Sequence, residues 1–491
     1  MLIWGAYDVD GITGATHLLQ TLRFHDVPST VHLPDRRKEG YGLNIPEIER
    51  LAAEEGPGIL LTVDCGISDV KAVERAKELG FMVVVSDHHM PPEELPPAHA
   101  ITNPRLSEDN PCPHLAGVGV AFFLMAALNG KLEAMSGKRM DMRQVLDLVA
   151  LGTLADKVSL TGQNRNLVKN GLLKIAEAKR PGLAELKGAS GFSPVAALGA
   201  GQVVFHLAQR INAAGRMDSP LDALELLLTM DNRRTVQRAQ MLDSHNRKRQ
   251  EEEEAIRTDA VQMLHNSFDP ERDNVIVLGS RAWHPGVVGI VASQLMRRYH
   301  KPTFVIAFDE SGVGKGSGRS IPGVSLVQAI HQCADTLVSG GGHDMAAGLV
   351  IEESRMDDFR RAFNRYVSET TTEEQRCPVL NIDMEVSFQA LTLDLLDSYD
   401  KLEPFGNSNP QPLFMSSDVF PTEPPKRVGT NHLKLFMRQG MVERDAIFFN
   451  GAERELPNPP WDIAFTIDRN VYRGRASLSI SIQEIRSHQE M

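Results

Sequence analysis

The stretch FMVVVSDHH, residues 81–89, predicts a buried β-strand that ends in acidic and imidazole side chains. A short continuous apolar run of this kind is typical of a parallel strand that is covered on both faces. Two earlier stretches follow the same plan, LIWGAYDVD at residues 2–10 and ILLTVDCG at residues 59–66, and a helix-like segment follows each. The alternation predicts a parallel α/β sheet with right-handed crossovers over residues 2 to about 105.

Acidic side chains follow all three predicted strands, and two histidines also follow the third. Because ligands bind at the carboxyl ends of the strands in an open parallel sheet, we expect these side chains to converge at one edge. Carboxylates gathered at low dielectric repel one another, so such a cluster requires cations. A further aspartate ends the apolar helix-like run LGTLAD, residues 151–156. The residues concerned are Asp8, Asp10, Asp64, Asp87, His88, His89 and Asp156.

The mixture of oxygen and nitrogen ligands suits Mn²⁺, with Mg²⁺, Fe²⁺ or Co²⁺ as alternatives. Two ions about 3.5–4 Å apart would form the clamp that hydrolyses phosphoesters. Each part has an ordinary explanation when taken alone, since a single aspartate after a strand is usually a helix cap. The joint pattern in three successive units predicts a metal-binding site.

The composition is that of an ordinary soluble globular protein. Of 491 residues, 42% are hydrophobic and 24% are charged, and the length predicts roughly three domains. No apolar run reaches the roughly 18 residues that span a bilayer, and no secretion signal follows Met1, so we expect no membrane association. Four scattered cysteines without a CxxC pair favour a reducing cytoplasm. The net charge of −12 argues against a protein that coats nucleic acid by charge alone, but bound divalent ions would reverse the field at a metal centre.

Four parts follow one another along the chain. Residues 1–230 form the predicted catalytic α/β domain, and residues 231–268 form a long polar helix that contains no glycine or proline between residues 233 and 266. A surface helix within one domain is the alternative interpretation of this segment. Residues 269–370 return to α/β, and residues 371–491 alternate apolar and polar residues, which predicts a small β-barrel of the OB type.

At these residues the sequence resembles the DHH phosphoesterase superfamily and, within it, the RecJ single-strand exonucleases. The tripeptide that names the superfamily is Asp87-His88-His89. Further similar motifs in the first domain are GYGL (40–43), ITNPR (101–105), HLAGVGVAFFL (114–124), DLVALGTLAD (147–156) and RINAAGR (210–216). Those that resemble the associated DHHA1 domain are HPGVVGIVASQL (284–295), KGSGRSIPG (315–323) and GGGHDMAAGL (340–349). The implied fold is α/β: a parallel-sheet DHH domain joined by a long helix to a smaller α/β DHHA1 domain, with a C-terminal OB-like β-barrel.

The resemblance implies a single-stranded-DNA-specific 5′-to-3′ exonuclease of DNA repair and recombination, in which a metal-activated water releases 5′-mononucleotides. It implies two Mn²⁺ or Mg²⁺ ions held by Asp8, Asp10, Asp64, His88 and Asp156. Asp64 would bridge the ions and act in catalysis with His88 and His89, of which His89 would touch the phosphate or the second metal. Asp87 would orient the histidines by hydrogen bonds without binding a metal ion itself.

The same resemblance implies how the substrate is held. Arg36, Ser317 and Arg319 would grip the 5′-phosphate, and Arg210 and Arg216 would contact the DNA backbone. His343 would lie near the scissile phosphate, in a glycine run whose amides can approach phosphate closely, although a plain tight turn is the alternative. A single-strand binding protein and a RecQ-type helicase are the implied partners of what we expect to be a monomer.

Aromatic residues of the predicted barrel are candidates for stacking against the bases of a single strand. Aromatic residues of this kind are more often core residues of a barrel than stacking platforms. The candidates are Phe436, Phe448, Trp461 and Tyr472.

Two departures from the family pattern keep alternatives open. Ala6 stands where the family usually has an acidic residue, and the first acidic motif follows Met1 almost at once, where RecJ proteins carry a further segment. A mis-assigned start, a fragment, or a protein without that segment would each explain the second departure. The other functions considered are a DHH–DHHA1 phosphodiesterase for oligoribonucleotides or cyclic dinucleotides, and a catalytically silent DNA-binding scaffold. An inorganic pyrophosphatase is disfavoured because Trp4 stands where that class needs a histidine.

Overall fold

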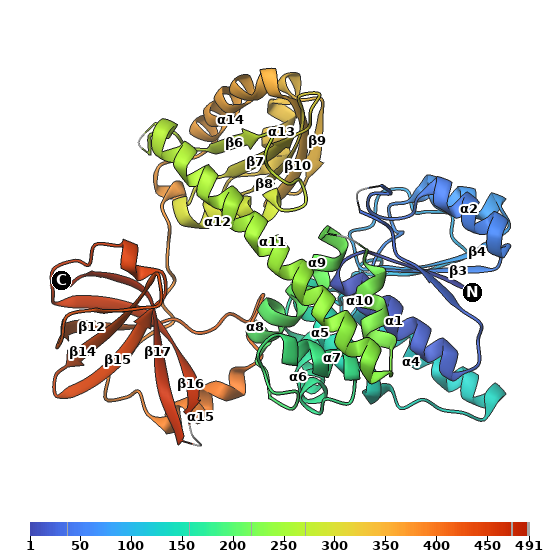
Figure 1. The fold of residues 1–491 in the computed structure, drawn as a ribbon, viewed down its shortest axis with the longest axis horizontal. Coiled ribbons are helices and arrows are strands. Elements are labelled where there is room, and N and C mark those ends of the chain that lie inside the picture. Colours follow the sequence, from blue (N-terminus) through green and yellow to red (C-terminus); the bar gives the residue numbers. More distant parts are fainter. Residues whose placement is uncertain (37, 157, 218, 271, 473–474, 489–491) are drawn as a thin grey trace. The chain divides into compact units, whose positions relative to one another are not determined.

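The computed structural model describes residues 1–36, 38–156, 158–217, 219–270, 272–472 and 475–488 (Figure 1). The chain divides into two compact units, which are described separately. The first consists of Met1–Asp156, Gly171–Leu198 and Gln202–Pro378, and the second of Lys157–Asn170, Gly199–Gly201 and Val379–Met491.

A parallel five-stranded sheet begins the first unit. Its strands run in the order β2-β1-β3-β4-β5, and every pairing between neighbours is parallel. The predicted parallel α/β sheet is therefore confirmed, and the three strands on which the prediction rested are adjacent, as β1, β3 and β4. Their carboxyl ends consequently meet at one edge. The bounds are β1 (Leu2–Gly5), β2 (Thr30–His32), β3 (Ile59–Val63), β4 (Met82–Ser86) and β5 (Ala100–Thr102).

Some helices pack against this sheet and others follow along the chain, of which α6 and α8 each contain residues of both units. Helix α1 packs against α4 and α5 (Figure 1). Helix α5 is buried at every position from Leu146 to Leu154, as expected for a helix that is apolar on all sides. The bounds are α1 (Val9–Phe24), α2 (Ile45–Glu55), α3 (Val70–Glu78), α4 (Gly117–Ser136), α5 (Leu146–Asp156), α6 (Gly162–Ala176), α7 (Pro181–Ala189), α8 (Ala200–Gln202), a π-helix (Val203–Ala208), α9 (Gln209–Met217) and α10 (Leu221–Leu228).

Helix α4 is long and apolar enough to cross a membrane by length and composition alone. Its packing gives it another role, because it lies against α1 and α5 and its first turn donates hydrogen bonds to the side chain of Asp10. A long apolar helix in the core of a domain passes the same test. The buried residues of α4 lie mainly in its first half, so we interpret α4 as a helix of this domain whose first half packs in the core.

The long polar segment forms one continuous helix, α11 (Asn232–Ser267), of 36 residues. It begins where the side chain of Asp231 accepts hydrogen bonds from the N–H groups of Arg233 and Arg234. Helix α11 packs against α7, α9 and α10, and also against α12 (Val288–Tyr299) of the following α/β part.

The remainder of the first unit is a mixed sheet in the order β6-β7-β8-β10-β9. Only the β6–β7 pairing is parallel among the described strands of this sheet. Phe304, Phe359 and Phe363 lie fully buried in its core. The bounds are β6 (Ile276–Ser280), β7 (Thr303–Phe308), β8 (Val313–Arg319), α13 (Leu326–Gln332), β9 (Ser339–Gly342), β10 (Ala346–Glu352) and α14 (Met356–Thr370).

The second unit contains the predicted barrel, which is confirmed as a closed structure of five strands. Strands β12, β16, β17, β15 and β14 are neighbours in that order, and an additional β12–β14 pairing closes the circle. Phe388, Phe465 and Ile467 are fully buried inside it. The bounds are β11 (Met384–Glu385), α15 (Leu393–Tyr399), β12 (Phe414–Pro421), β13 (Lys426–Val428), β14 (His432–Gln439), β15 (Val442–Phe448), β16 (Trp461–Tyr472) and β17 (Arg475–Ser487).

Candidate metal centre

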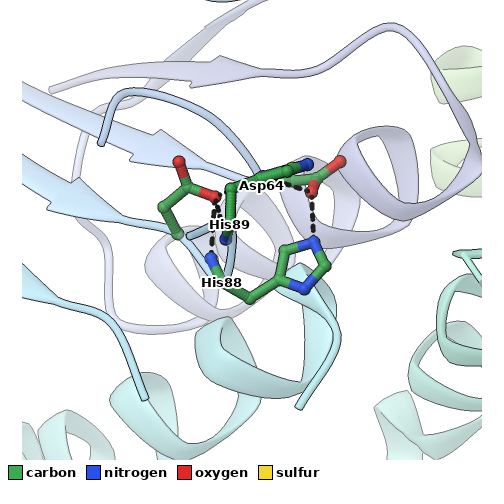
Figure 2. A group of neighbouring side chains, drawn as sticks. Asp64, His88 and His89 are labelled. Atoms are coloured by element: carbon green, nitrogen blue, oxygen red, sulfur yellow. Dashed lines mark hydrogen bonds and ion pairs between the residues drawn. The ribbon is translucent and has the colours of Figure 1, made fainter. Parts of the chain in front are cut away.

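Three carboxylates converge on one imidazole at the carboxyl edge of the first sheet. The Nε2 atom of His88 lies 3.0 Å from Oδ1 of Asp64, 3.6 Å from Oδ2 of Asp156 and 3.8 Å from Oδ2 of Asp10. Figure 2 shows the ring of His88 turned toward the Asp64 carboxylate, with His89 beside it. Residues far apart in the sequence are therefore gathered at one point, as the strand pattern predicts.

The N-terminus of α4 holds Asp10 in place. The backbone N–H of Gly117 donates to Oδ2 of Asp10 at 2.6 Å, and that of Val118 donates to Oδ1 at 2.8 Å. Unpaired N–H groups and the helix dipole favour a carboxylate at such a helix end. A Cβ atom added to Gly117 would lie 2.6 Å from Cβ of Asp64, so only glycine lets α4 approach this closely.

Asp64 lies in a backbone conformation that few residues other than glycine adopt, with φ of 61°. Its carbonyl oxygen accepts a hydrogen bond of 2.6 Å from the hydroxyl of Tyr41, and its N–H donates to the carbonyl of Ser86 on β4. A non-glycine residue in this region is typical of functional sites whose surroundings enforce the geometry. The strain keeps the carboxylate, which is 1% exposed, directed at His88.

Asp87 orients the segment that follows β4. Its Oδ1 atom lies 2.7 Å from Nδ1 of His89 and accepts from the N–H groups of His88 and His89, while its Oδ2 atom accepts from the N–H of Ile67. These bonds lower the pKa of Asp87 against the opposing effect of burial, which is the largest influence on it. Asp87 thus fixes the ring of His89 and the backbone of His88, whereas the ring of His88 faces the other carboxylates.

Burial and mutual repulsion make this cluster unfavourable without positive charge. Burial raises the pKa of Asp10 to about 7, with a second contribution from Asp8. Burial, then repulsion from Asp10 and Asp8, raises the pKa of Asp156 to about 9, and the pKa of Asp64 is raised well above its usual value by the same causes. Burial lowers the pKa of His88 to about 4, which leaves a neutral imidazole able to act as a ligand.

The donor set fits divalent cations. Ligand atoms of Asp10, His88 and Asp156 lie within 4.8 Å of one another, and so do those of a second group consisting of Asp64, Asp87, His88 and His89. Carboxylate oxygens with one or two imidazole nitrogens are the ligands that Mn²⁺ takes, and Mg²⁺ accepts the carboxylates. Asp8, the remaining predicted ligand, caps α1 by accepting from the N–H of Gly11 at 3.1 Å, and it is close enough to raise the pKa values of its neighbours.

Three of the arginines predicted to bind the substrate, Arg36, Arg216 and Arg319, influence one another. The guanidinium of Arg36 is exposed and lies 5.4 Å from the centre of the Tyr7 ring. Burial lowers the pKa of Arg216 to about 10, and repulsion from Arg36, Arg249 and Arg319 adds to the effect. Such a gathering of guanidinium groups favours binding of an anion. Arg319 donates to Oγ of Ser317 at 3.1 Å, which places these two predicted residues side by side on β8.

The other two predicted substrate residues lie differently. Arg210 is engaged within the protein, since its Nε donates to Asp243 of α11 at 2.9 Å and its Nη1 donates to the carbonyl of His206. His343 is exposed in the turn between β9 and β10.

Three residues lie beside the metal cluster although the sequence predicted no role for them. All three belong to motifs quoted above. Tyr41, from GYGL, contacts the Asp64 carbonyl and lies 3.3 Å from Nε2 of His89. Arg105 and Asn103, from ITNPR, donate to the carbonyls of His88 and His89. The signal that could have identified them is their position in motifs that follow the strand ends, but their partners are backbone atoms, which a sequence does not reveal.

The aromatic residues predicted as stacking platforms are mostly in the core of the barrel. Trp461 is 3% exposed and Phe448 is 4% exposed, which agrees with the alternative interpretation as core residues. Phe436 is partly exposed, and the ammonium groups of Lys426 and Lys434 lie 4.5 Å and 5.2 Å from its ring centre. The side chain of Tyr472 is outside the described part of the structure.

Comparison with known proteins agrees with this fold and cluster. The DHH family's N-terminal domain matches residues 1–153, the DHHA1 domain matches residues 272–369, and the RecJ OB domain matches residues 382–484. Together with the carboxylate–imidazole cluster, these matches define the class as the metal-dependent DHH phosphoesterases.

Individual relatives show to which family within this class the chain belongs. The single-stranded-DNA-specific exonuclease RecJ of Haemophilus influenzae is 36% identical, over 99% of this chain and 87% of its own length. RecJ of Bacillus subtilis is 34% identical over 99% of this chain, which spans only 61% of that relative. The structure of Thermus thermophilus RecJ in complex with Mn²⁺ superposes with a TM-score of 0.83 at 30% identity, over 100% of this chain and 69% of that one. The chain belongs to the RecJ family.

Proposed function

We propose that this chain is a single-stranded-DNA-specific 5′-to-3′ exonuclease that releases 5′-mononucleotides. The observation that carries the proposal is the convergence of Asp10, Asp64 and Asp156 on His88 at the edge of a parallel sheet. Phosphoester hydrolysis is the reaction for which a buried cluster of carboxylates and imidazole at a strand edge is suited. The match of residues 382–484 to a RecJ-type barrel favours the exonuclease over a phosphodiesterase that acts on dinucleotides.

The predicted site residues have different roles in this proposal. Asp8, Asp10, Asp64, His88 and Asp156 would hold two ions, Mn²⁺ or Mg²⁺, the metals that structures of RecJ from Thermus thermophilus contain. When bound, such ions lower the pKa of a coordinated water and neutralise charge on the phosphate. Asp87 keeps the His89 ring fixed through its 2.7 Å contact, and the side chain of His89 is 43% exposed, so its open side is available to a phosphate oxygen.

The 5′ end is held by cations and hydroxyls in this proposal. Arg36, Arg319 and Ser317 grip the terminal phosphate, and Arg216 contacts the backbone of the strand. Guanidinium groups are planar donors that match phosphate oxygens, and a hydrogen bond between ionised partners is stronger than one between neutral groups. Arg210 and His343 complete the predicted contacts. Arg210 would have to exchange its bond with Asp243 for one with DNA.

The proposal also covers the cellular setting. A reducing cytoplasm suits a chain whose described cysteines are all free thiols. A single-strand binding protein would present the substrate, and a RecQ-type helicase would generate it by unwinding duplex DNA. The protein would act as a monomer.

Digestion of end-labelled DNA tests the proposal. Single-stranded oligonucleotides labelled at the 5′ or the 3′ end are incubated with Mn²⁺ and the full chain, alongside Asp64→Ala. We expect the 5′ label to appear at once as a mononucleotide, the 3′ label to persist until the end of digestion, and Asp64→Ala to release neither. Release of the 3′ label first would contradict the polarity, and equal digestion by folded Asp64→Ala would contradict the site.

A further inference from the structure

A loop between β2 and α2, residues 33–44, carries two groups to the site. Tyr41 contacts the Asp64 carbonyl, and Arg36 is the proposed ligand of the 5′-phosphate. Gly40 and Gly42 both have φ of +84°, so the chain turns sharply on each side of Tyr41. Buried Leu33 and Leu43 anchor the two ends of this loop, and polar contacts add to that packing.

His32, the last residue of β2, lies between two carboxylates. Its Nε2 atom is 2.8 Å from Oε2 of Glu39, and its Nδ1 atom is 3.5 Å from Oε1 of Glu47. The His32 side chain is 14% exposed, and its ring centre is 4.2 Å from that of Trp4. An imidazole N–H on Nε2 donates to Glu39, which is the shorter of the two contacts.

The two glutamates that contact His32 lie in different parts of the segment between β2 and α2. Glu39 lies within the loop, where its Oε1 atom accepts from the N–H of Asp35 at 2.8 Å. Glu47 lies in the first turn of α2, where Arg50 contacts both of its oxygens. The charge of Glu47 is thus already balanced by Arg50, whereas Glu39, at 19% side-chain exposure, faces His32.

The two halves of the loop have different anchors, and one bond joins them, from the side-chain amide of Asn44 to the Glu39 carbonyl at 3.3 Å. The half with Tyr41 is held by Trp4, whose Nε1 donates to the Gly42 carbonyl at 3.1 Å, and by the carboxylate of Asp69, which accepts from the N–H of Leu43. The half with Arg36 is tied to Glu39 through the N–H of Asp35, the residue before Arg36. Loss of the His32–Glu39 contact should therefore disturb Arg36 more than Tyr41.

We propose that His32 is a positioning residue that clamps Glu39 and thereby holds Arg36 where it receives the 5′-phosphate. The inference rests on the proposed function, since it assigns a purpose to one part of that site. This role of His32 affects one part of the site only. Binding of the 5′-phosphate depends on His32, whereas the metal cluster, which Tyr41 contacts, does not.

Kinetics on matched substrates test this role. The values of kcat and KM are measured with Mn²⁺ for the full chain and for His32→Ala, on single-stranded DNA with a 5′-phosphate or a 5′-hydroxyl. We expect KM for the 5′-phosphorylated strand to rise about tenfold in His32→Ala, the equivalent of about 1.4 kcal/mol and the size of one charge-assisted hydrogen bond. The value of kcat should stay within about twofold, as should KM for the 5′-hydroxyl strand, because neither involves Arg36.

Further variants separate positioning from folding. His32→Gln keeps a neutral donor toward Glu39 and should restore part of the preference for 5′-phosphate. His25→Ala is the matched control, because His25 is another buried histidine, bonded to Asn129 at 2.9 Å. It should lower the melting temperature without changing the ratio of the two KM values. Should His32→Ala fail to fold, Glu39→Gln tests the same contact and should shift the ratio in the same direction.

Binding measured by fluorescence anisotropy in EDTA keeps the test independent of cleavage. A preference for 5′-phosphate that persists unchanged in His32→Ala and Glu39→Gln would overturn the inference, and so would an equal loss of affinity for both strands. A wild-type chain that binds both strands alike would overturn it together with the role of Arg36. A chain that shows the predicted binding shift but cuts neither strand would contradict the proposed function alone.

Discussion

Asp10 shows how a contact distant in sequence determines the geometry of a side chain. Its position after β1 predicts that it lies at the sheet edge, and it does. Its orientation depends on the N–H of Gly117, 107 residues away, and on the absence of a side chain there. The motif that contains Gly117 was visible in the sequence, but the reason for its glycine was not, because that reason is a distance to Asp64.

Replacing Gly117 by alanine should damage the metal centre. The added Cβ would lie 2.6 Å from Cβ of Asp64, so either α4 or the strained backbone of Asp64 must move. Overpacking of this kind costs roughly 1–3 kcal/mol, and we expect a lower melting temperature together with at least a tenfold loss of Mn²⁺ affinity, measured by calorimetry. Gly119→Ala in the same helix is the control, since its nearest neighbour would be 3.4 Å away. Wild-type Mn²⁺ affinity in Gly117→Ala would refute this explanation.

Arg210 marks a limit of prediction from motifs. The resemblance assigns it to the DNA backbone, and that assignment stays a prediction. In the structure its guanidinium is bonded to Asp243, a residue of α11 that no pattern connects with it. Arg319 differs from it, because burial, and then repulsion from Arg36, lowers the pKa of Arg319, and a bound anion would relieve that gathering of positive charge.

Among the helices, an arginine whose side chain is 10% exposed joins four elements of the catalytic domain. Arg180, at the start of α7, contacts both carboxylate oxygens of Asp147 on α5, at 2.7 Å and 3.2 Å. It also donates to the carbonyl of Leu227 on α10 and to Oε1 of Gln20 on α1. Continuous apolar runs predict the strands well, but a polar junction between helices leaves no periodic signal. No simple sequence pattern predicts the π-helix at Val203–Ala208 either.

Removing this arginine should destabilise the helical region strongly. Arg180→Ala would leave the carboxylate of Asp147, 7% exposed, without its counter-charge, which typically costs 3–5 kcal/mol at about room temperature. We expect chemical denaturation to show a loss of about that size. The double variant Arg180→Ala with Asp147→Ala should lose less than the sum of the two single variants. Strict additivity would mean that the pair is not coupled.

For the chain as a whole, domain order and class followed from the sequence, while the surfaces that handle DNA did not. The alternating residues of the barrel predict its strands because one face of each must be buried. They do not show which aromatic residues remain outside, and Trp461 and Phe448 are inside. The net charge of −12 is similarly uninformative about the site, where the decisive charges are a few buried carboxylates.

Those carboxylates link metal binding to pH. The pKa of Asp10 is raised to about 7 and that of Asp156 to about 9, so the metal-free folded chain holds protons that the unfolded chain has released. Their contribution to the stability of the metal-free chain is therefore present at low pH and is lost as pH rises through these values. Metal ions must displace the same protons, so affinity for the ions should increase as pH rises toward about 9.

Titration of the full chain with Mn²⁺, followed by the paramagnetic resonance of the free ion, tests the metal centre most directly. The structure predicts about two ions per chain at pH 8, binding weakened at least about tenfold at pH 6, and loss of binding in an Asp64→Ala variant that circular dichroism shows to be folded. Absence of bound Mn²⁺ in the wild-type chain at pH 8, or undiminished binding in Asp64→Ala, would contradict the assignment of this cluster as the metal centre.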